Sequence, residues 1–96
     1  MIVRYTRGAV QDIEAIAKYI RERNPSAAVQ VRGRIEGLIA GLVDFPQQGT
    51  LTDERDIRRL VAIPYPYLIF YRIKGETVII MHIRHGRRRP EQIGSG

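Results

Sequence analysis

The chain has 96 residues, enough for one domain, which we expect to span residues 1–93 with a flexible tail at residues 94–96. Its net charge is +6, and because its only lysines are Lys18 and Lys74, its other cationic side chains are arginines. The planar guanidinium of arginine pairs with carboxylate or phosphate, which favours a basic recognition surface over a merely solvated basic face. The absence of cysteine excludes disulfide bonds, thiolate metal ligands and a thiol nucleophile, and it agrees with the cytoplasmic location that we expect.

The N-terminal part predicts a strand followed by a helix. Residues 2–5 are mostly β-branched or aromatic, which favours a strand, and the absence of a following apolar run is not typical of a secretory signal. Over residues 9–23 apolar side chains recur at spacings of three and four, which predicts an amphipathic helix. We expect this helix to start at Thr6 or Gly8.

A second helix is predicted at residues 25–45, so that the two helices form a hairpin. Asn24 is a suitable N-cap, Pro25 is tolerated in the first turn, and Pro46 ends the pattern. Residues 47–56 are polar and predict a surface loop. The apolar positions of the second helix are expected to be buried, namely Ala28, Val31, Ile35, Leu38, Ile39 and Leu42.

Three strands complete the predicted sheet, at residues 57–63, 67–74 and 77–84. Gly75 and Glu76 between the last two strands fit a type II′ hairpin turn. The longest apolar run of the chain lies here, but two prolines interrupt it and it is too short to span a bilayer. The whole pattern predicts a single-domain α+β fold of the order βααβββ, with a helical hairpin packed on a mainly antiparallel sheet.

The last strand carries the change from apolar to cationic character. Side chains alternate between the two faces of a strand, so one face would be fully apolar and the other would turn cationic along its length. The first face is predicted to carry Ile79, Met81 and Ile83, and the second Val78, Ile80, His82 and Arg84.

The residue types limit the chemistry that the chain could perform. The only serines, Ser26 and Ser95, lie at a helix start and in the tail, so we expect no nucleophilic triad. His82 and His85 are three residues apart on a strand, where they fall on opposite faces and lack nearby carboxylates. We therefore predict no metal and no other cofactor.

Acid–base cleavage of RNA is the enzymatic possibility that the sequence leaves open. Such a reaction needs cations for the phosphoryl charge and a group that can donate a proton. If the chain is a ribonuclease, the candidate catalytic residues are Arg72, Arg84 and His85.

Four short motifs occur in a fixed order within residues 3–90. They are Arg58-x-Leu60, Pro66-Tyr67, Tyr71-Arg72 and His85-Gly86-Arg87-Arg88, and NPSAA precedes them at the start of the second predicted helix. In this order the chain resembles the ParE branch of the RelE/ParE toxin superfamily. The resemblance implies the toxin of a type II toxin–antitoxin system with a βααβββ fold.

A toxin of this kind is neutralised by an acidic, ParD-like antitoxin in a hetero-oligomeric complex. The resemblance implies antitoxin contacts on the helical hairpin and on an apolar groove beside the sheet. It implies contact with DNA only indirectly, through the antitoxin, and no membrane partner.

The resemblance also implies a target. ParE-like members inhibit DNA gyrase by binding, whereas RelE-like members are ribosome-dependent mRNA endoribonucleases, which is the alternative. The chain lacks the terminal tyrosine of the RelE-like members and has His82 where many relatives have arginine. Matching the family pattern residue by residue, we expect the target-binding surface at Arg58, Arg72, His85, Arg87 and Arg88.

Overall fold

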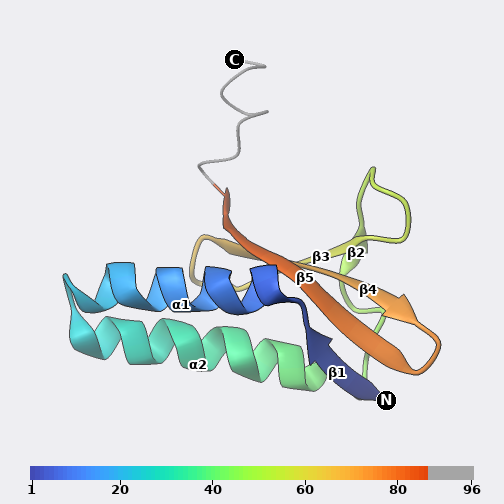
Figure 1. Ribbon diagram of the computed structural model, residues 1–96, viewed down its shortest axis with the longest axis horizontal. Coiled ribbons are helices and arrows are strands. Elements are labelled where there is room, and N and C mark those ends of the chain that lie inside the picture. Colours follow the sequence, from blue (N-terminus) through green and yellow to red (C-terminus); the bar gives the residue numbers. More distant parts are fainter. Residues whose placement is uncertain (87–96) are drawn as a thin grey trace.

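Two helices lie side by side along one side of a five-stranded sheet in the computed structural model, which describes residues 1–86 (Figure 1). The strand order is β1-β5-β4-β3-β2, and only the pairing of β1 with β5 is parallel. This arrangement confirms the predicted α+β fold and its mainly antiparallel sheet. The strands are β1 (Ile2–Tyr5), β2 (Thr50–Leu51), β3 (Arg58–Val61), β4 (Tyr67–Lys74) and β5 (Thr77–His85).

The helices are α1 (Arg7–Arg21) and α2 (Pro25–Gly41). Thr6 caps α1 by accepting a hydrogen bond from the Ala9 N–H at 3.0 Å, and Asn24 caps α2 in the same way. The prediction that α2 continues to residue 45 is wrong. After Gly41 the backbone tightens into turns in which the N–H groups of residues 42–44 bond to carbonyls three residues earlier, and these turns end the α-helix.

The segment between α2 and β3 contains a short strand that the sequence did not reveal. Thr50 and Leu51 form β2, which pairs antiparallel with β3, although we expected a loop throughout residues 47–56. The β4–β5 turn agrees with the prediction, since Gly75 has the positive φ of 60° that the first position of a type II′ turn requires.

A β-bulge interrupts β5. Phe70 pairs with His82 and Tyr71 pairs with Ile80, so Met81 is an extra residue opposite β4. The prediction of strict alternation is therefore wrong, because the residues beyond Met81 exchange faces. Ile83 follows Val78 and Ile80 onto one face, while His82 and Arg84 follow Ile79 onto the other.

The two faces of the sheet have different surroundings. The covered face packs against the helices and carries Tyr67, Ile69, Tyr71, Val78, Ile80 and Ile83, all buried. The open face carries Arg59, Leu68, Phe70, Arg72, Ile79, His82 and Arg84, which are half-buried or exposed. Within residues 1–86 no helix crosses the open face.

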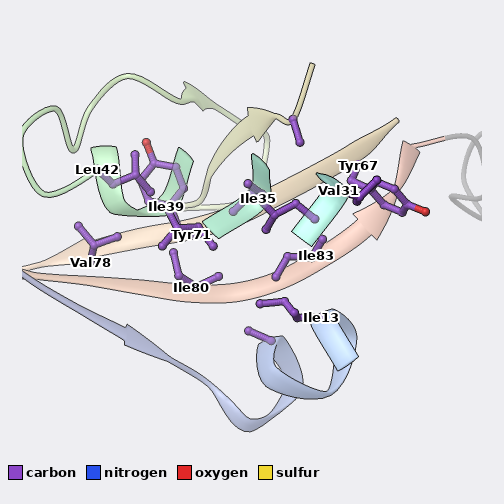
Figure 2. Close-up of a cluster of buried hydrophobic side chains, with 13 residues drawn as sticks. Ile13, Val31, Ile35, Ile39, Leu42, Tyr67, Tyr71, Val78, Ile80 and Ile83 are labelled. Atoms are coloured by element: carbon purple, nitrogen blue, oxygen red, sulfur yellow. The ribbon is translucent and has the colours of Figure 1, made fainter. Parts of the chain in front are cut away.

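The core lies between α2 and the covered face (Figure 2). Ile35 and Ile39 of α2 point toward Tyr71 and Ile80 of the sheet, and all four side chains are at most 2% exposed. Burial of such side chains supplies most of the stabilisation of a small domain. The predicted core of α2 is confirmed except at Leu38, which is half-buried.

The phenol of Tyr71 fastens the loop that follows α2 to the core. Its oxygen donates to the Pro46 carbonyl at 2.8 Å and accepts from the Gly49 N–H at 2.9 Å. Gly49 approaches so closely that a Cβ there would lie 2.6 Å from the Tyr71 oxygen, so only glycine fits.

Side chains of Thr6, which caps α1, and of Asp12 within α1 close the edge of β5 where β1 has ended. The Thr6 hydroxyl donates to the Met81 carbonyl at 2.9 Å, and the Asp12 carboxylate accepts from the Ile83 N–H at 3.0 Å. These two contacts satisfy strand groups that would otherwise form an open sheet edge. Over residues 1–86, no helix has the length and apolar character needed to cross a membrane.

Candidate functional site

A cationic floor covers the open face of the sheet. Arg59, Phe70 and His82 lie in one row across β3, β4 and β5, because their Cα atoms are direct partners. Arg72 follows Phe70 by two residues on β4, and Arg84 follows His82 by two residues on β5. Alternation of side chains along a strand places all five on the same face. Three consecutive strands thus bring four cationic or titratable groups around one aromatic ring.

This floor belongs to a groove of about 1090 Å³. Asp12, Ala15 and Ile16 of α1 border it beside β5, and residues 51–54 and Ile57 of the β2–β3 connection border it beside β3. In Figure 1 that connection projects from the sheet as a separate loop. Its carboxylates, together with Asp12, make the walls acidic while the floor is basic.

Three arginines of the floor make no polar side-chain contact with other residues of the described range 1–86. Among residues 1–86, neither an ion pair nor a hydrogen bond engages the side chains of Arg59, Arg72 and Arg84. The Nε atom of Arg72 is buried and has no hydrogen-bond partner among these residues. A buried donor without a partner is costly, so a bound acceptor at this position would remove that cost.

His82 is held at the groove by the N-terminal part of α1. Its Nδ1 lies 3.6 Å from the Asp12 Oδ2, and the same oxygen accepts the Ile83 N–H. The His82 side chain is 46% exposed, so its ring stays accessible from the groove. This contact could not be predicted, since Asp12 and His82 are 70 positions apart and meet only in the fold.

The structure does not bring His85 onto the floor. Its Cα pairs with Tyr67 on the covered side, and the two rings meet edge to face with centroids 5.4 Å apart. His85 borders the end of the groove and also lines a small apolar pocket of about 300 Å³ with Ala15, Ile16 and Tyr19. Of the three candidate ribonuclease residues, only Arg72 and Arg84 therefore share a face.

Arg58 has a different environment from the one we expected. Its Cα pairs with the buried Tyr71, and its guanidinium donates to the carbonyls of Gly49 at 2.7 Å and Gln47 at 3.2 Å. This side chain fastens the loop after α2, and it is its neighbour Arg59 that lies on the open face. Arg87 and Arg88, the other predicted target-binding residues, lie outside the described residues.

The site contains no arrangement that suggests a metal ion. Among residues 1–86, no three His, Cys, Asp or Glu side chains lie close enough to hold one. What the groove offers is a set of fixed positive charges, hydrogen-bond donors and one aromatic ring. Such a surface suits binding of an anionic partner.

Comparison with known proteins gives consistent matches over nearly the whole chain. The family described as "ParE toxin of type II toxin-antitoxin system, parDE" matches residues 3–90. The chain is 31% identical over 91 residues to Y4kP of Sinorhizobium fredii, covering 95% of this chain and 94% of that protein. It is 35% identical over 84 residues to Toxin RelE2 of Caulobacter vibrioides, covering 88% of this chain and 93% of that protein.

A solved structure shares the fold. The structure titled "Chromosomal ParDE TA system from P. aeruginosa" superposes with a TM-score of 0.79 at 24% sequence identity. The superposition covers 88% of this chain and 95% of that chain. The two proteins therefore share this fold.

Proposed function

Because the chain belongs to the ParE toxin family of type II toxin–antitoxin systems, we propose that it arrests bacterial growth until a cognate antitoxin binds it. Its net charge of +6 complements an acidic antitoxin, and a segment that folds as it docks is the usual way for such a partner to cover a large surface. The similar structure from P. aeruginosa is a ParDE system, which supports a ParD-like partner for this chain.

DNA gyrase is the target that we propose, with inhibition by binding. Gyrase is the target that the resemblance to the ParE branch implies. The observation that supports the place of contact is the set of open-face arginines, Arg59, Arg72 and Arg84, none of which has a partner within residues 1–86. A target surface on the open face would leave the helical hairpin available to the antitoxin.

The alternative is a ribosome-dependent mRNA endoribonuclease. One observation favours it: Arg72, Arg84 and His82 lie on the same face, where they could bind a phosphodiester and exchange a proton. The position of His85 beside Tyr67 does not support its predicted role as the proton donor.

Pulse labelling of DNA and protein synthesis tests the target. The chain is induced without its antitoxin in a bacterial culture, and incorporation of labelled thymidine and labelled methionine is followed over the first minutes. We expect DNA synthesis to stop first, followed by filamentation and a DNA-damage response. If protein synthesis stops first, the gyrase proposal is wrong and the endoribonuclease takes its place.

Two matched variants locate the contact in the same assay. Arg72→Ala removes one charge from the open face, and we expect growth arrest to be weakened. The control is Arg21→Ala, because Arg21 is exposed on α1 and makes no hydrogen bond or ion pair within residues 1–86. Equal toxicity of both variants would remove the open face from the proposal.

A further inference from the structure

The end of β5 that carries His82 and Arg84 lies at an edge of the sheet. β1 pairs with β5 only as far as Tyr5 and Ile80, so within residues 1–86 the segment from Met81 onward has β4 on one side and no strand on the other. The bulge at Met81 falls at the same place. Bulges disrupt the ladder of strand hydrogen bonds and strand edges open more easily than paired strands, so this segment needs a further support if its side chains are to stay in place.

Asp12 of α1 supplies this support. Its Oδ2 accepts a hydrogen bond from the Ile83 N–H at 3.0 Å and lies 3.6 Å from the His82 Nδ1. The Asp12 side chain is 26% exposed, and a hydrogen bond to a carboxylate in such a partly buried position is among the stronger ones. One carboxylate oxygen thus contacts two successive residues of the edge.

The anchored N–H lies between the two open-face residues of this edge. Ile83 follows His82 and precedes Arg84, and its own side chain is 2% exposed in the core. Because the core holds the Ile83 side chain and Asp12 holds its N–H, the backbone at Ile83 resists both sliding along β4 and moving away from it. The places of His82 and Arg84 on the open face then follow from that of Ile83.

From this arrangement we infer that Asp12 is a positioning residue of the open face. Its carboxylate holds the bulged edge of β5 by accepting the Ile83 N–H, and this contact sets where His82 and Arg84 meet the target. The role belongs to the position of the acceptor and not to its negative charge, which by itself weakens the positive potential of the groove. The inference rests on the proposed function, because the face that Asp12 positions is the one proposed to contact gyrase.

Three substitutions of Asp12 separate the acceptor from the charge. Asp12→Ala removes both. Asp12→Asn removes the charge but keeps a carbonyl oxygen at the same distance from the backbone, whereas Asp12→Glu keeps the charge but moves it by one methylene group. The control is Glu22→Ala, because Glu22 is exposed at the end of α1 and its side chain makes no hydrogen bond or ion pair within residues 1–86.

The purified full chain and its variants are compared in two measurements, each made well below the melting temperature of every variant. One is the concentration that inhibits supercoiling of relaxed plasmid by DNA gyrase, and the other is the hydrogen-exchange rate of the Ile83 amide by NMR. We expect Asp12→Ala to raise both about tenfold. Asp12→Asn should raise them only about threefold, since a neutral acceptor bonds about half as strongly as a charged one. Asp12→Glu should recover less than Asp12→Asn, and Glu22→Ala should stay close to the wild type.

The outcomes distinguish this inference from the proposed function. If Asp12→Ala inhibits gyrase as well as the wild type does, Asp12 has a role in stability alone and the inference is overturned while the proposed function stands. Recovery by Asp12→Glu but not by Asp12→Asn overturns it too, because the charge would then be what matters, and this comparison decides if Asp12→Ala does not fold.

Absence of inhibition by the wild type contradicts the proposed function instead. The order of the variants is then scored by growth arrest in cells, which does not presuppose gyrase, and by exchange at Ile83. An unchanged exchange rate in Asp12→Ala, or equal growth arrest by all variants, overturns the inference in that case as well.

Discussion

Arg58 and Arg59 are neighbours on β3, yet they lie in opposite surroundings. The Cα of Arg58 pairs with that of Tyr71, whose side chain lies on the covered face, and the Arg58 guanidinium donates to two carbonyls of the loop after α2. The Cα of Arg59 pairs with that of Phe70, whose side chain lies on the open face, and the Arg59 side chain makes no hydrogen bond or ion pair within residues 1–86. The position of a residue along a strand thus decides whether its guanidinium holds the fold or stays available for a partner.

The same contrast extends over the two faces of the sheet. The covered face is apolar and closed by the helices, so it supplies packing energy. The open face accumulates like charges and a buried donor that has no hydrogen-bond partner within residues 1–86, which is unfavourable. A fold can tolerate such a cost at a binding surface when its stability is concentrated elsewhere.

The largest difference between the faces should appear in their apolar side chains. Ile69→Ala on the covered face removes a fully buried side chain and is expected to lower the free energy of unfolding by about 2–5 kcal/mol. Leu68→Ala on the open face removes a half-buried side chain of the same size, and we expect about half that cost or less. Urea unfolding of both variants measures the difference. Equal costs would show that the open face is packed as tightly as the covered one.

Tyr71→Phe tests the contact between the core and the loop after α2. The substitution keeps the buried ring but removes the oxygen that bonds to Pro46 and Gly49. A buried Gly49 N–H without an acceptor should cost about 1–3 kcal/mol in thermal or urea unfolding. Wild-type stability in this variant would mean that the loop does not depend on the phenol.

The same variant has a consequence at high pH. Burial raises the pKa of the Tyr71 phenol, against the opposing effects of the Gly49 N–H and Arg58. Its raised pKa makes the folded state hold the proton more tightly than the unfolded state. The stabilisation is therefore fully present below about pH 10 and is lost as the pH rises through the raised value.

We expect Tyr71→Phe to lose less stability than the wild type as the pH rises above about 10. Tyr5 also has a raised pKa, chiefly through burial and then through Glu36, so part of the loss should remain in the variant. Melting temperatures measured across this range, with Tyr5→Phe as the comparison, test the assignment. An unchanged pH dependence in Tyr71→Phe would contradict it.

Much of the fold could be predicted because local signals agreed with it. Thr6 and Asn24 cap the helices as their residue types indicate, and Gly75 has the backbone that its turn requires. The end of α2 was predicted too late, because the apolar pattern continues to Leu42 while the backbone already forms local turns after Gly41, and β2 could not be predicted, since it depends on a distant strand. β2 exists because Thr50 and Leu51 pair with β3, and no pattern within two residues can reveal that.

The candidate site was predictable in its charge and only partly in its geometry. Arg72 of β4 and Arg84 of β5 share the open face, but the bulge at Met81 determines which residues of β5 lie on that face. A bulge inserts one residue without a distinctive sequence signal, so alternation counted along the strand assigned the wrong faces beyond it. Adjacent residues of a strand face opposite ways, so only one of Arg58 and Arg59 can lie on the open face, and we expected Arg58 in the target-binding surface. The sequence could not show that the Arg58 guanidinium would donate hydrogen bonds to the carbonyls of Gln47 and Gly49.

The matched substitutions Arg58→Ala and Arg59→Ala address the comparison most directly and have the smallest expected effect on stability. Arg58→Ala leaves the Gly49 and Gln47 carbonyls without their donor, and because the site is partly exposed we expect a loss of about 1–2 kcal/mol. Arg59→Ala removes no contact within residues 1–86 and should change stability by about 0.5 kcal/mol or less.

Toxicity should show the reverse order. We expect Arg59→Ala to weaken growth arrest in cells while keeping the wild-type melting temperature, because it removes a charge only from the open face. Arg58→Ala should retain growth arrest at a temperature where it is still folded, because its guanidinium lies on the other side of the sheet. If Arg58→Ala abolished toxicity while remaining folded, and Arg59→Ala did not affect it, the target surface would include the loop after α2, and the division of roles between the two faces would be wrong.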